Sequence, residues 1–383
     1  MRGRGPAVPG VVVDAGRESM EHSSENSEAA DPAAGVRVLL VADPGLPTRR
    51  AESIQEDLQQ LLNEVYSPPI ELEVRTAMLR LRADGSLDLS QALDQARSIG
   101  EPDAVLLLTE IPRVQDGRPL IAEIFPEHNI AVVSCPTLGV LTSRRRILDT
   151  LMACTVRMKP TREERDSSRY ERRWAHWQEV TGPEEHQLML GSRGIGGART
   201  VAGMVTGNEP LRTAPKLSKA LAAAAATGAF GIFYSSIWSM SMHLSPLRLL
   251  GIGALAMVAI TAWLILGNRL WDSPKRAGLS RVVLLYNLST VLTLLTVVAL
   301  LYMALVAAIF IGAVIVIDPE YLASVLEQEP TVARYLDIAW LSAAMGVVAG
   351  ALGSSFDDDT DLRQITHGQR ERQRQYTEEE SGE

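Results

Sequence analysis

The stretch Val282–Ile317, VVLLYNLSTVLTLLTVVALLYMALVAAIFIGAVIVI, decides the architecture of this chain. It contains no charged residue and no proline, which is typical of a helix that crosses a membrane. A single span needs about 20 apolar residues, so the stretch is either one long helix of roughly 54 Å or two spans joined by a tight turn. One helix of that length exceeds the hydrocarbon core, and we expect it to tilt or to project beyond one face.

Charges around the apolar stretches decide between one helix and a hairpin. The segment 318–337 is rich in acidic residues and contains a single arginine, Arg334. Basic residues instead gather before the first apolar stretch, between the second and third, and after the fourth. Because cytoplasmic flanks carry the excess of lysine and arginine, one long helix gives a consistent alternation that starts inside. We therefore predict a multi-pass protein of the plasma membrane, held in the lipid bilayer with both termini cytoplasmic, and with spans over 220–240, 249–267, 282–317 and 335–353.

The region before the membrane has the pattern of a folded α/β domain over residues 36–160. Short apolar runs indicate buried strands, and the spacing of Ile54, Leu58, Leu61, Leu62 and Val65 indicates the buried face of a helix. Strands that alternate with helices predict a three-layer, mostly parallel sheet. The predicted strands are Val36–Ala42, Ile70–Leu81, Ala104–Leu108, Pro119–Phe125 and Ile130–Val133, and the predicted helices are Pro47–Val65, Leu89–Ile99 and Ser143–Lys159.

Polar residues follow three of these strands directly. Asp43 comes after the first strand, Thr109 and Glu110 after the third, and Cys135 after the last. Ligands of α/β sheets bind at the carboxyl ends of the strands, so these four residues are the candidate ligand-binding site. The alternative is structural: Asp43 would cap a turn, Glu110 would be solvated and Cys135 would belong to the core.

Several site classes lack support in the sequence. The net charge of −9 without a basic patch argues against nucleic-acid binding. The six histidines have no ligand spacing, and the two cysteines indicate buried thiols, so we predict neither a metal site nor a disulfide. The run Gly191–Gly196, GSRGIG, resembles a dinucleotide-binding turn, but its glycine spacing is one residue short and the first apolar stretch follows too soon. We therefore predict no cofactor and assign no catalytic residue.

The remaining segments read as tails and connecting helices. Residues 1–35 are rich in Ser, Glu, Gly and Pro, which predicts a disordered tail, and 354–383 form a charged cytoplasmic tail. In 161–219 we expect a charged helix over Arg162–Val180 and an amphipathic helix after Arg193 that lies at the headgroups. Arg144–Arg146 opens a helix against its dipole, so acidic neighbours, an anionic ligand or anionic lipid must compensate for these charges.

Four segments resemble a family of actinobacterial membrane proteins that have an N-terminal α/β domain and four transmembrane helices. The segments are Ser134–Arg146 (SCPTLGVLTSRRR), Ala220–Trp238 (ALAAAAATGAFGIFYSSIW), Leu284–Leu295 (LLYNLSTVLTLL) and Ala339–Gly353 (AWLSAAMGVVAGALG). The resemblance implies the same layout for most of this chain, from Val36 to Gln375, and implies no particular activity.

Three functions compete. The first is a non-enzymatic membrane protein whose cytoplasmic domain binds a protein partner or a small ligand and thereby senses, scaffolds or regulates. The second is a membrane-tethered enzyme that uses the strand-end cleft. The third is a transporter or channel subunit, which the absence of ionisable residues from the apolar stretches argues against. The sequence leaves the oligomeric state and the identity of the ligand open.

Overall fold

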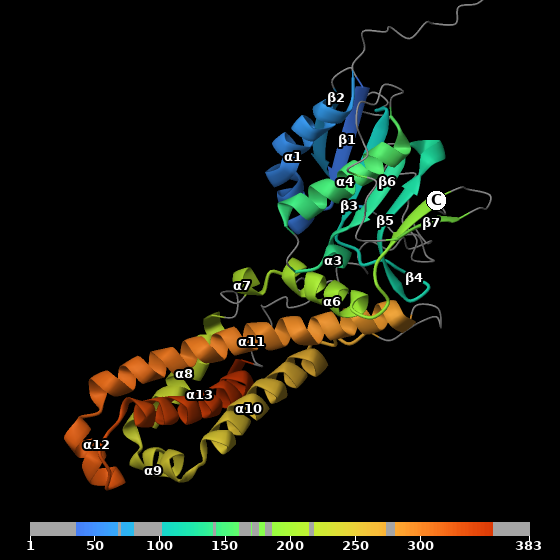
Figure 1. The fold of residues 1–383 in the computed structure, drawn as a ribbon. Coiled ribbons are helices and arrows are strands. Elements are labelled where there is room, and N and C mark those ends of the chain that lie inside the picture. The colour runs from blue at the N-terminus through green and yellow to red at the C-terminus, as the bar shows by residue number, and fades with distance from the viewer. Residues whose placement is uncertain are drawn as a thin grey trace, which may run out of the picture. The chain divides into compact units, whose positions relative to one another are not determined.

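The fold was analysed in a computed structural model of the chain, which combines a mixed α/β sheet domain with several long apolar helices (Figure 1). The expected disordered tail (1–35), the expected helix Leu89–Ile99 and the C-terminal tail beyond Ser354 lie outside the residues that the structure describes. Those residues are 36–67, 70–79, 102–140, 143–160, 170, 176–180, 186–213, 218–272 and 280–354.

Within the described residues, the sheet domain contains eight strands in the order β2-β1-β3-β6-β5-β8-β7, with β4 paired to β5. All five predicted strands are present, although the second ends earlier than predicted, at Thr76. The strands are β1 (Val36–Ala42), β2 (Ile70–Thr76), β3 (Ala104–Thr109), β4 (Val114–Gln115), β5 (Arg118–Phe125), β6 (Ile130–Ser134), β7 (His176–Val180) and β8 (His186–Leu190).

The predicted parallel core is present, because four of the five predicted strands run parallel, but the complete sheet is mixed. The four strands β2, β1, β3 and β6 run parallel, whereas β5, β8 and β7 each pair antiparallel with their neighbours. The short connection between β5 and β6 explains the change of direction. It consists of the 3-10 turn η1 (Pro126–His128) and Asn129 in the left-handed conformation (φ 50°), and so short a link can join only antiparallel strands.

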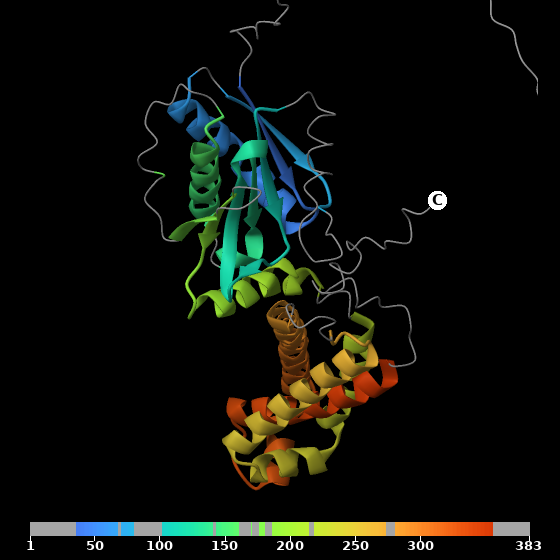
Figure 2. The same ribbon diagram turned by 90° about the vertical axis from the view of Figure 1, so that its right-hand side faces the viewer.

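Two helices, α1 (Leu46–Val65) and α4 (Arg144–Met158), lie side by side on one face of the sheet (Figures 1 and 2). The predicted spacing on α1 holds, since Ile54 and Leu58 are fully buried in the main core. Ser143 caps α4 as predicted, and its hydroxyl accepts a hydrogen bond from the Arg146 N–H at 3.2 Å. Among the described residues, these helices supply one of the two helical layers that we predicted.

The sheet continues past the expected domain boundary at residue 160. Strands β7 and β8 extend it beyond β5, so the predicted helix over Arg162–Val180 is wrong at least for its last five residues, His176–Val180. In the sequence Tyr170, Trp174 and Trp177 have the i, i+4, i+7 spacing of a helix, but Trp177 packs on the main core from within β7. Pairing with β8 outweighs local propensity here, because strand formation depends chiefly on neighbouring strands.

Helix α6 (Gly196–Gly207) follows β8 and packs on the sheet domain, chiefly against the short helix α3 (Cys135–Leu138). A Cβ on Gly203 would lie 2.1 Å from the Pro136 carbonyl oxygen, and one on Gly196 would lie 2.5 Å from Pro119, so both glycines permit close contact. The GSRGIG run therefore serves helix packing. The predicted amphipathic helix exists, and at least one of its faces contacts protein.

Three described helices are long and apolar enough to cross a membrane, or four if one bent pair counts as a span. The bent pair, α8 and α9, covers the expected span 220–240. The chain turns by 85° at this break, where Tyr234 adopts an extended conformation. The helices of this region are α7 (Pro210–Thr213), α8 (Ser218–Phe233), α9 (Ser235–His243), α10 (Pro246–Gly267), α11 (Ser280–Val316), α12 (Pro319–Leu326) and α13 (Val332–Ser354).

Helices α8 and α13 pack more closely than any other described helix pair. Small residues make this possible, since a Cβ on Gly346 would lie 2.5 Å from the Ala224 carbonyl oxygen. On the α8 side, a Cβ on Gly231 would overlap the Ser342 side chain. Close backbone contact through small residues is the usual way in which helices associate in lipid.

The stretch Val282–Ile317 lies almost entirely in one continuous helix, α11, of 37 residues. Two of its buried polar residues, Asn287 and Thr293, form hydrogen bonds to neighbouring segments. Asn287 accepts a hydrogen bond from the Asp272 N–H at 2.9 Å and donates to the Asp272 carbonyl at 2.8 Å, and Thr293 accepts from the Asn208 amide at 2.8 Å. These polar groups hold neighbouring segments together, so the amide of Asn287 has a structural role.

Candidate functional site

The carboxyl ends of β1, β3 and β6 bring the four predicted site residues close together. Asp43 and Thr109 are fully buried, while Glu110 and Cys135 are 5% and 3% exposed. The Thr109 hydroxyl donates to one Asp43 carboxylate oxygen at 2.6 Å. The strand ends therefore form one polar cluster, as the order of strands in a parallel sheet requires.

The carboxylate of Asp43 accepts hydrogen bonds from three groups of the same domain. One oxygen accepts from the Leu79 N–H at 2.9 Å, and the other accepts from the Thr109 hydroxyl and from the Glu110 N–H at 3.0 Å. The Asp43 carbonyl also accepts a hydrogen bond from the Thr48 hydroxyl at 2.8 Å. Asp43 thus fixes the segments that leave β1, β2 and β3, which matches the structural alternative for this residue.

The thiol of Cys135 lies next to this carboxylate and is held in its neutral form. Burial raises the pKa of Cys135 to about 12, and the nearby Arg50 only partly opposes this effect. A thiol must lose its proton to act as a nucleophile, and at neutral pH this one does not. The side chain belongs to the main core together with Cys154.

A cavity of about 570 Å³ lies elsewhere, at the edge strand β2. Two of the side chains that line it, Gln59 and Asn63 on α1, bind the outer edge of that strand. The Gln59 amide oxygen accepts from the Leu72 N–H at 2.8 Å, its nitrogen donates to the Ile70 carbonyl, and the Asn63 oxygen accepts from the Ile70 N–H at 2.9 Å. The amides of Gln59 and Asn63 are therefore already bonded to the strand.

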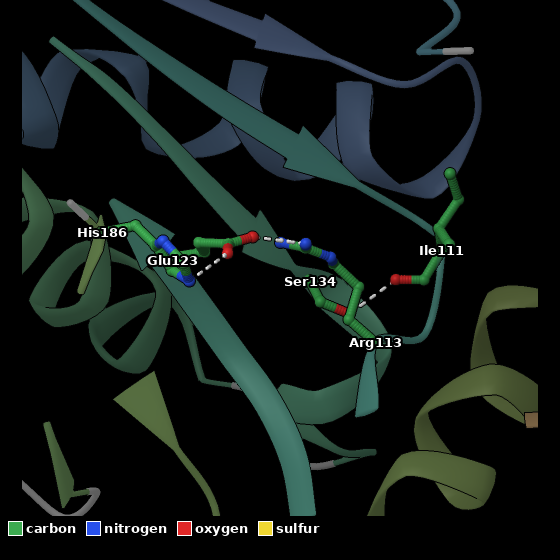
Figure 3. A network of polar contacts seen from close by, with 5 residues as sticks. All are labelled: Ile111, Arg113, Glu123, Ser134 and His186. Atoms are coloured by element: carbon green, nitrogen blue, oxygen red, sulfur yellow. Dashed lines mark hydrogen bonds and ion pairs between the residues drawn. The ribbon is translucent and has the colours of Figure 1, made fainter. Parts of the chain in front are cut away.

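A second polar network lies in the middle of the sheet, and the sequence interpretation missed it (Figure 3). Glu123 on β5 is only 7% exposed and lies between Arg113 and His186. Its carboxylate pairs with the Arg113 guanidinium and lies 3.7 Å from the His186 Nε2 atom. The imidazole of His186 also stacks on Phe125, with ring centroids 5.8 Å apart. The network joins β5, β8 and the segment after β3.

The network anchors the segment that follows β3 to the sheet. The Ser134 hydroxyl at the end of β6 donates to the Ile111 carbonyl at 2.7 Å, two residues before Arg113 (Figure 3). A charge at this depth is tolerated only when it is paired. One signal in the sequence could have revealed the pair, because Glu123 is the single acid in the otherwise apolar run Pro119–Phe125.

The arginines at the start of α4 have different partners. Arg144 pairs with Asp57 on α1 at 2.7 Å, and Arg145 lies 3.9 Å from Asp149 on its own helix. Arg146 turns toward α3 and donates to the Leu138 carbonyl at 3.4 Å. Arg144 and Arg145 thus have acidic neighbours, which is one of the compensations that we expected.

Among the described residues, no group of three or more His, Cys, Asp or Glu side chains is placed to hold a metal ion. The polar cluster at the strand ends contains two acids and one thiol. Its donors and acceptors bond mainly to the chain itself, so the arrangement supports the fold more directly than it supports chemistry.

Comparisons with known proteins assign this chain to no family. No family model matches it, and no curated protein matches it. Among solved structures it is similar to the crystal structure of archaemetzincin from Methanopyrus kandleri, with 21% identity and a TM-score of 0.28, over 34% of this chain and 77% of that chain. So weak a likeness supports no statement about fold or activity. The resemblance to actinobacterial membrane proteins therefore stays a prediction.

Proposed function

We propose that this chain is an integral membrane protein whose α/β domain is a cytoplasmic binding module with a sensing or regulatory role. The observation that carries this proposal is the state of the strand-end cluster. The two carboxylate oxygens of Asp43 accept hydrogen bonds from three donors of its own domain, and the Cys135 thiol is buried and neutral. Groups that act in catalysis must reach a substrate in an activated form, whereas these groups stabilise the domain.

The membrane assignment is supported by helices of sufficient length and apolar character. The cytoplasmic position of both termini rests on the charge pattern. Basic segments precede α8 and the long helix α11, whereas the segment 318–337 after α11 is acidic. A reporter fused after Glu383 is expected to be active only in the cytoplasm. A reporter inserted after Glu329, between α12 and α13, is expected to be active only outside. The opposite result for either fusion would refute this topology.

An enzyme at the strand ends is the second candidate, because Asp43, Glu110 and Cys135 do lie together. A transporter has less support, because the buried polar residue in α11 with the strongest hydrogen-bonding capacity, Asn287, bonds to the backbone of Asp272. Conductance or uptake by reconstituted protein would revive the transporter proposal. Turnover that is lost in Glu110→Gln, with the fold retained, would revive the enzyme proposal.

The binding proposal is tested on the full chain in lipid nanodiscs. Both cysteines of the chain, Cys135 and Cys154, are buried in the sheet domain, so maleimide labelling reports when that domain opens. The labelling midpoint temperature is measured across a panel of phosphate, carboxylates, nucleotides, amino acids and peptides. A ligand that binds the folded domain raises this midpoint. If no class on the panel raises it, the small-ligand form of the proposal fails.

A further inference from the structure

Strand β2 lies at one end of the sheet, next to β1 (Figure 1). The bonds of Gln59 show which of its residues turn their backbone groups outward. The Gln59 side chain bonds to the Ile70 carbonyl and to the Leu72 N–H, on the side of β2 away from β1. The backbone groups of a strand point alternately to its two edges, so those of Val74 and Thr76 point outward as well.

Four of these outward backbone groups are open. Gln59 occupies the Leu72 N–H but leaves the Leu72 carbonyl. Among the residues that the structure describes, that carbonyl, the N–H and carbonyl of Val74 and the Thr76 N–H form no hydrogen bond. The cavity of about 570 Å³, which Leu72 and Val74 help to line, leaves space beside them. Donors and acceptors in this order match the backbone of another extended chain.

The order of the open groups makes this edge complementary to a second copy of itself. If two β2 strands run antiparallel with Val74 at the two-fold axis, the two Val74 residues exchange both of their hydrogen bonds. The Leu72 carbonyl of each copy then faces the N–H of the partner's Thr76. All four open groups of each copy are satisfied in this register, and the Gln59 bond to Leu72 stays in place. Only the Thr76 carbonyl, at the end of the strand, stays outside the pairing.

The charged side chains of β2 fit the same register. Glu73 and Arg75 form an ion pair within one copy, and their side chains are 42% and 59% exposed. In the antiparallel register Glu73 lies opposite the partner's Arg75, and Arg75 lies opposite the partner's Glu73. Four charges of alternating sign then surround the axis, and opposite charges in directly facing positions stabilise a strand pair. A second copy of this chain supplies both the hydrogen-bonding groups and the charges in the required order.

We propose that two copies of this protein pair antiparallel through residues 72–76 of β2 and so join their sheets into one. The contact is limited at one end by Gln59 and at the other by the end of the strand at Thr76. So short an interface is weak compared with that of a stable dimer, and we expect it to form reversibly. The pairing needs no ligand, so it goes beyond the proposed binding function and does not depend on it.

The register is tested by disulfide cross-linking in isolated membranes that contain the full chain. Val74→Cys places two thiols in directly facing positions with Cα atoms about 5.5 Å apart, which a disulfide can bridge. Thr76→Cys is the matched control, because Thr76 is the more exposed residue, but its two copies lie about 13 Å apart along the strands. With copper–phenanthroline as oxidant, Val74→Cys is expected to cross-link at least about tenfold faster than Thr76→Cys. The wild-type chain gives the baseline, since both of its cysteines are buried.

The charges are tested by reversal in the Val74→Cys background. Glu73→Arg places like charges opposite each other twice, so it is expected to slow cross-linking at least about fivefold. The double variant Glu73→Arg/Arg75→Glu reverses the order of the charges and makes it complementary again. Cross-linking is expected to return to within about twofold of the original rate.

Several results would overturn the pairing. Equal rates for Val74→Cys and Thr76→Cys would indicate chance collisions, and a double charge variant as slow as Glu73→Arg would exclude the register. Absence of the Val74→Cys cross-link would exclude the dimer. Maleimide labelling of that thiol would then show whether the edge is open, if labelling is fast, or covered by another segment or partner, if it is slow. If Val74→Cys does not fold, Glu73→Cys/Arg75→Cys replaces it, because these exposed positions face each other across the same axis.

Discussion

Replacing Asp43 gives the sharpest test of the structural role of the strand-end cluster. Its carboxylate accepts from the Leu79 N–H, the Thr109 hydroxyl and the Glu110 N–H, and the side chain is fully buried. In Asp43→Asn one carboxylate oxygen is replaced by an NH₂ group. Because NH₂ is itself a hydrogen-bond donor, at least one of the three donors loses its acceptor. In Asp43→Ala all three donors lose their acceptor.

The size of the effect follows from the cost of a buried donor that has no acceptor, about 1–3 kcal/mol. We expect Asp43→Asn to lower the free energy of unfolding by about 2 kcal/mol and Asp43→Ala to lower it by roughly 3–6 kcal/mol. A domain of this kind is stable by about 5–15 kcal/mol, so the alanine variant approaches unfolding. The matched control is Glu73→Gln on β2, because the Glu73 carboxylate forms an exposed ion pair with Arg75.

The assay is the rate at which maleimide labels Cys154 in native buffer, resolved by mass spectrometry. Where opening is in rapid equilibrium, the rate follows the population of the open domain. A loss of about 2 kcal/mol speeds labelling roughly thirtyfold, whereas the surface control is expected to change it less than about fivefold. An Asp43→Asn protein that labels as slowly as wild type, or more slowly, refutes the structural role. Slower labelling would indicate a functional acid, since replacing functional residues often stabilises a protein.

Three further predictions address other parts of the chain. The free energy of unfolding is expected to fall as the pH rises above about 9, because burial raises the pKa of Cys135 from its ordinary value of 9.0 to about 12 and the unfolded state deprotonates first. Cys135→Ala should remove this part of the slope in urea titrations at several pH values, and an unchanged slope would contradict the assignment. Glu123→Gln leaves the partly buried Arg113 guanidinium without its carboxylate and should cost about 3–5 kcal/mol in urea titration, while exposed Glu127→Gln should change little; equal midpoints would exclude the ion pair. Gly346→Ala places a Cβ 2.5 Å from the α8 backbone and should cost about 1–3 kcal/mol, whereas Gly251→Ala meets nothing within 4 Å. The loss of helical circular dichroism on heating in detergent measures both, and the packing argument fails if the two variants melt together.

Local patterns predicted the elements that depend on local chemistry. Apolar runs and turn residues correctly predicted five strands, and Ser143 correctly predicted the start of α4. The strand-end rule also grouped Asp43, Thr109, Glu110 and Cys135 correctly. These features follow from the spacing of buried apolar residues and from helix capping, and both depend only on residues close together in the chain.

Features that depend on distant partners were missed. The strand His176–Val180 exists because β8 pairs with it, and the partners of Glu123 come from segments on either side of β5 in the chain. The bend at Tyr234 was also missed, because the run 220–240 contains no proline and the polar pair Ser235–Ser236 directly after Tyr234 was not interpreted as a break. Composition gives the length of an apolar helix, whereas tertiary contacts determine where it breaks.

The amide of Gln59 has a consequence for how copies of this protein meet. Anchoring in a bilayer, as proposed here, confines the sheet domains of many copies to one plane and raises their encounter rate. An open strand edge in that plane would recruit the edge of the next copy. Along the first part of β2 the Gln59 side chain already occupies the backbone groups of Ile70 and Leu72, so a neighbouring strand would first have to displace it. This part of the edge is therefore not available for pairing with a neighbouring copy.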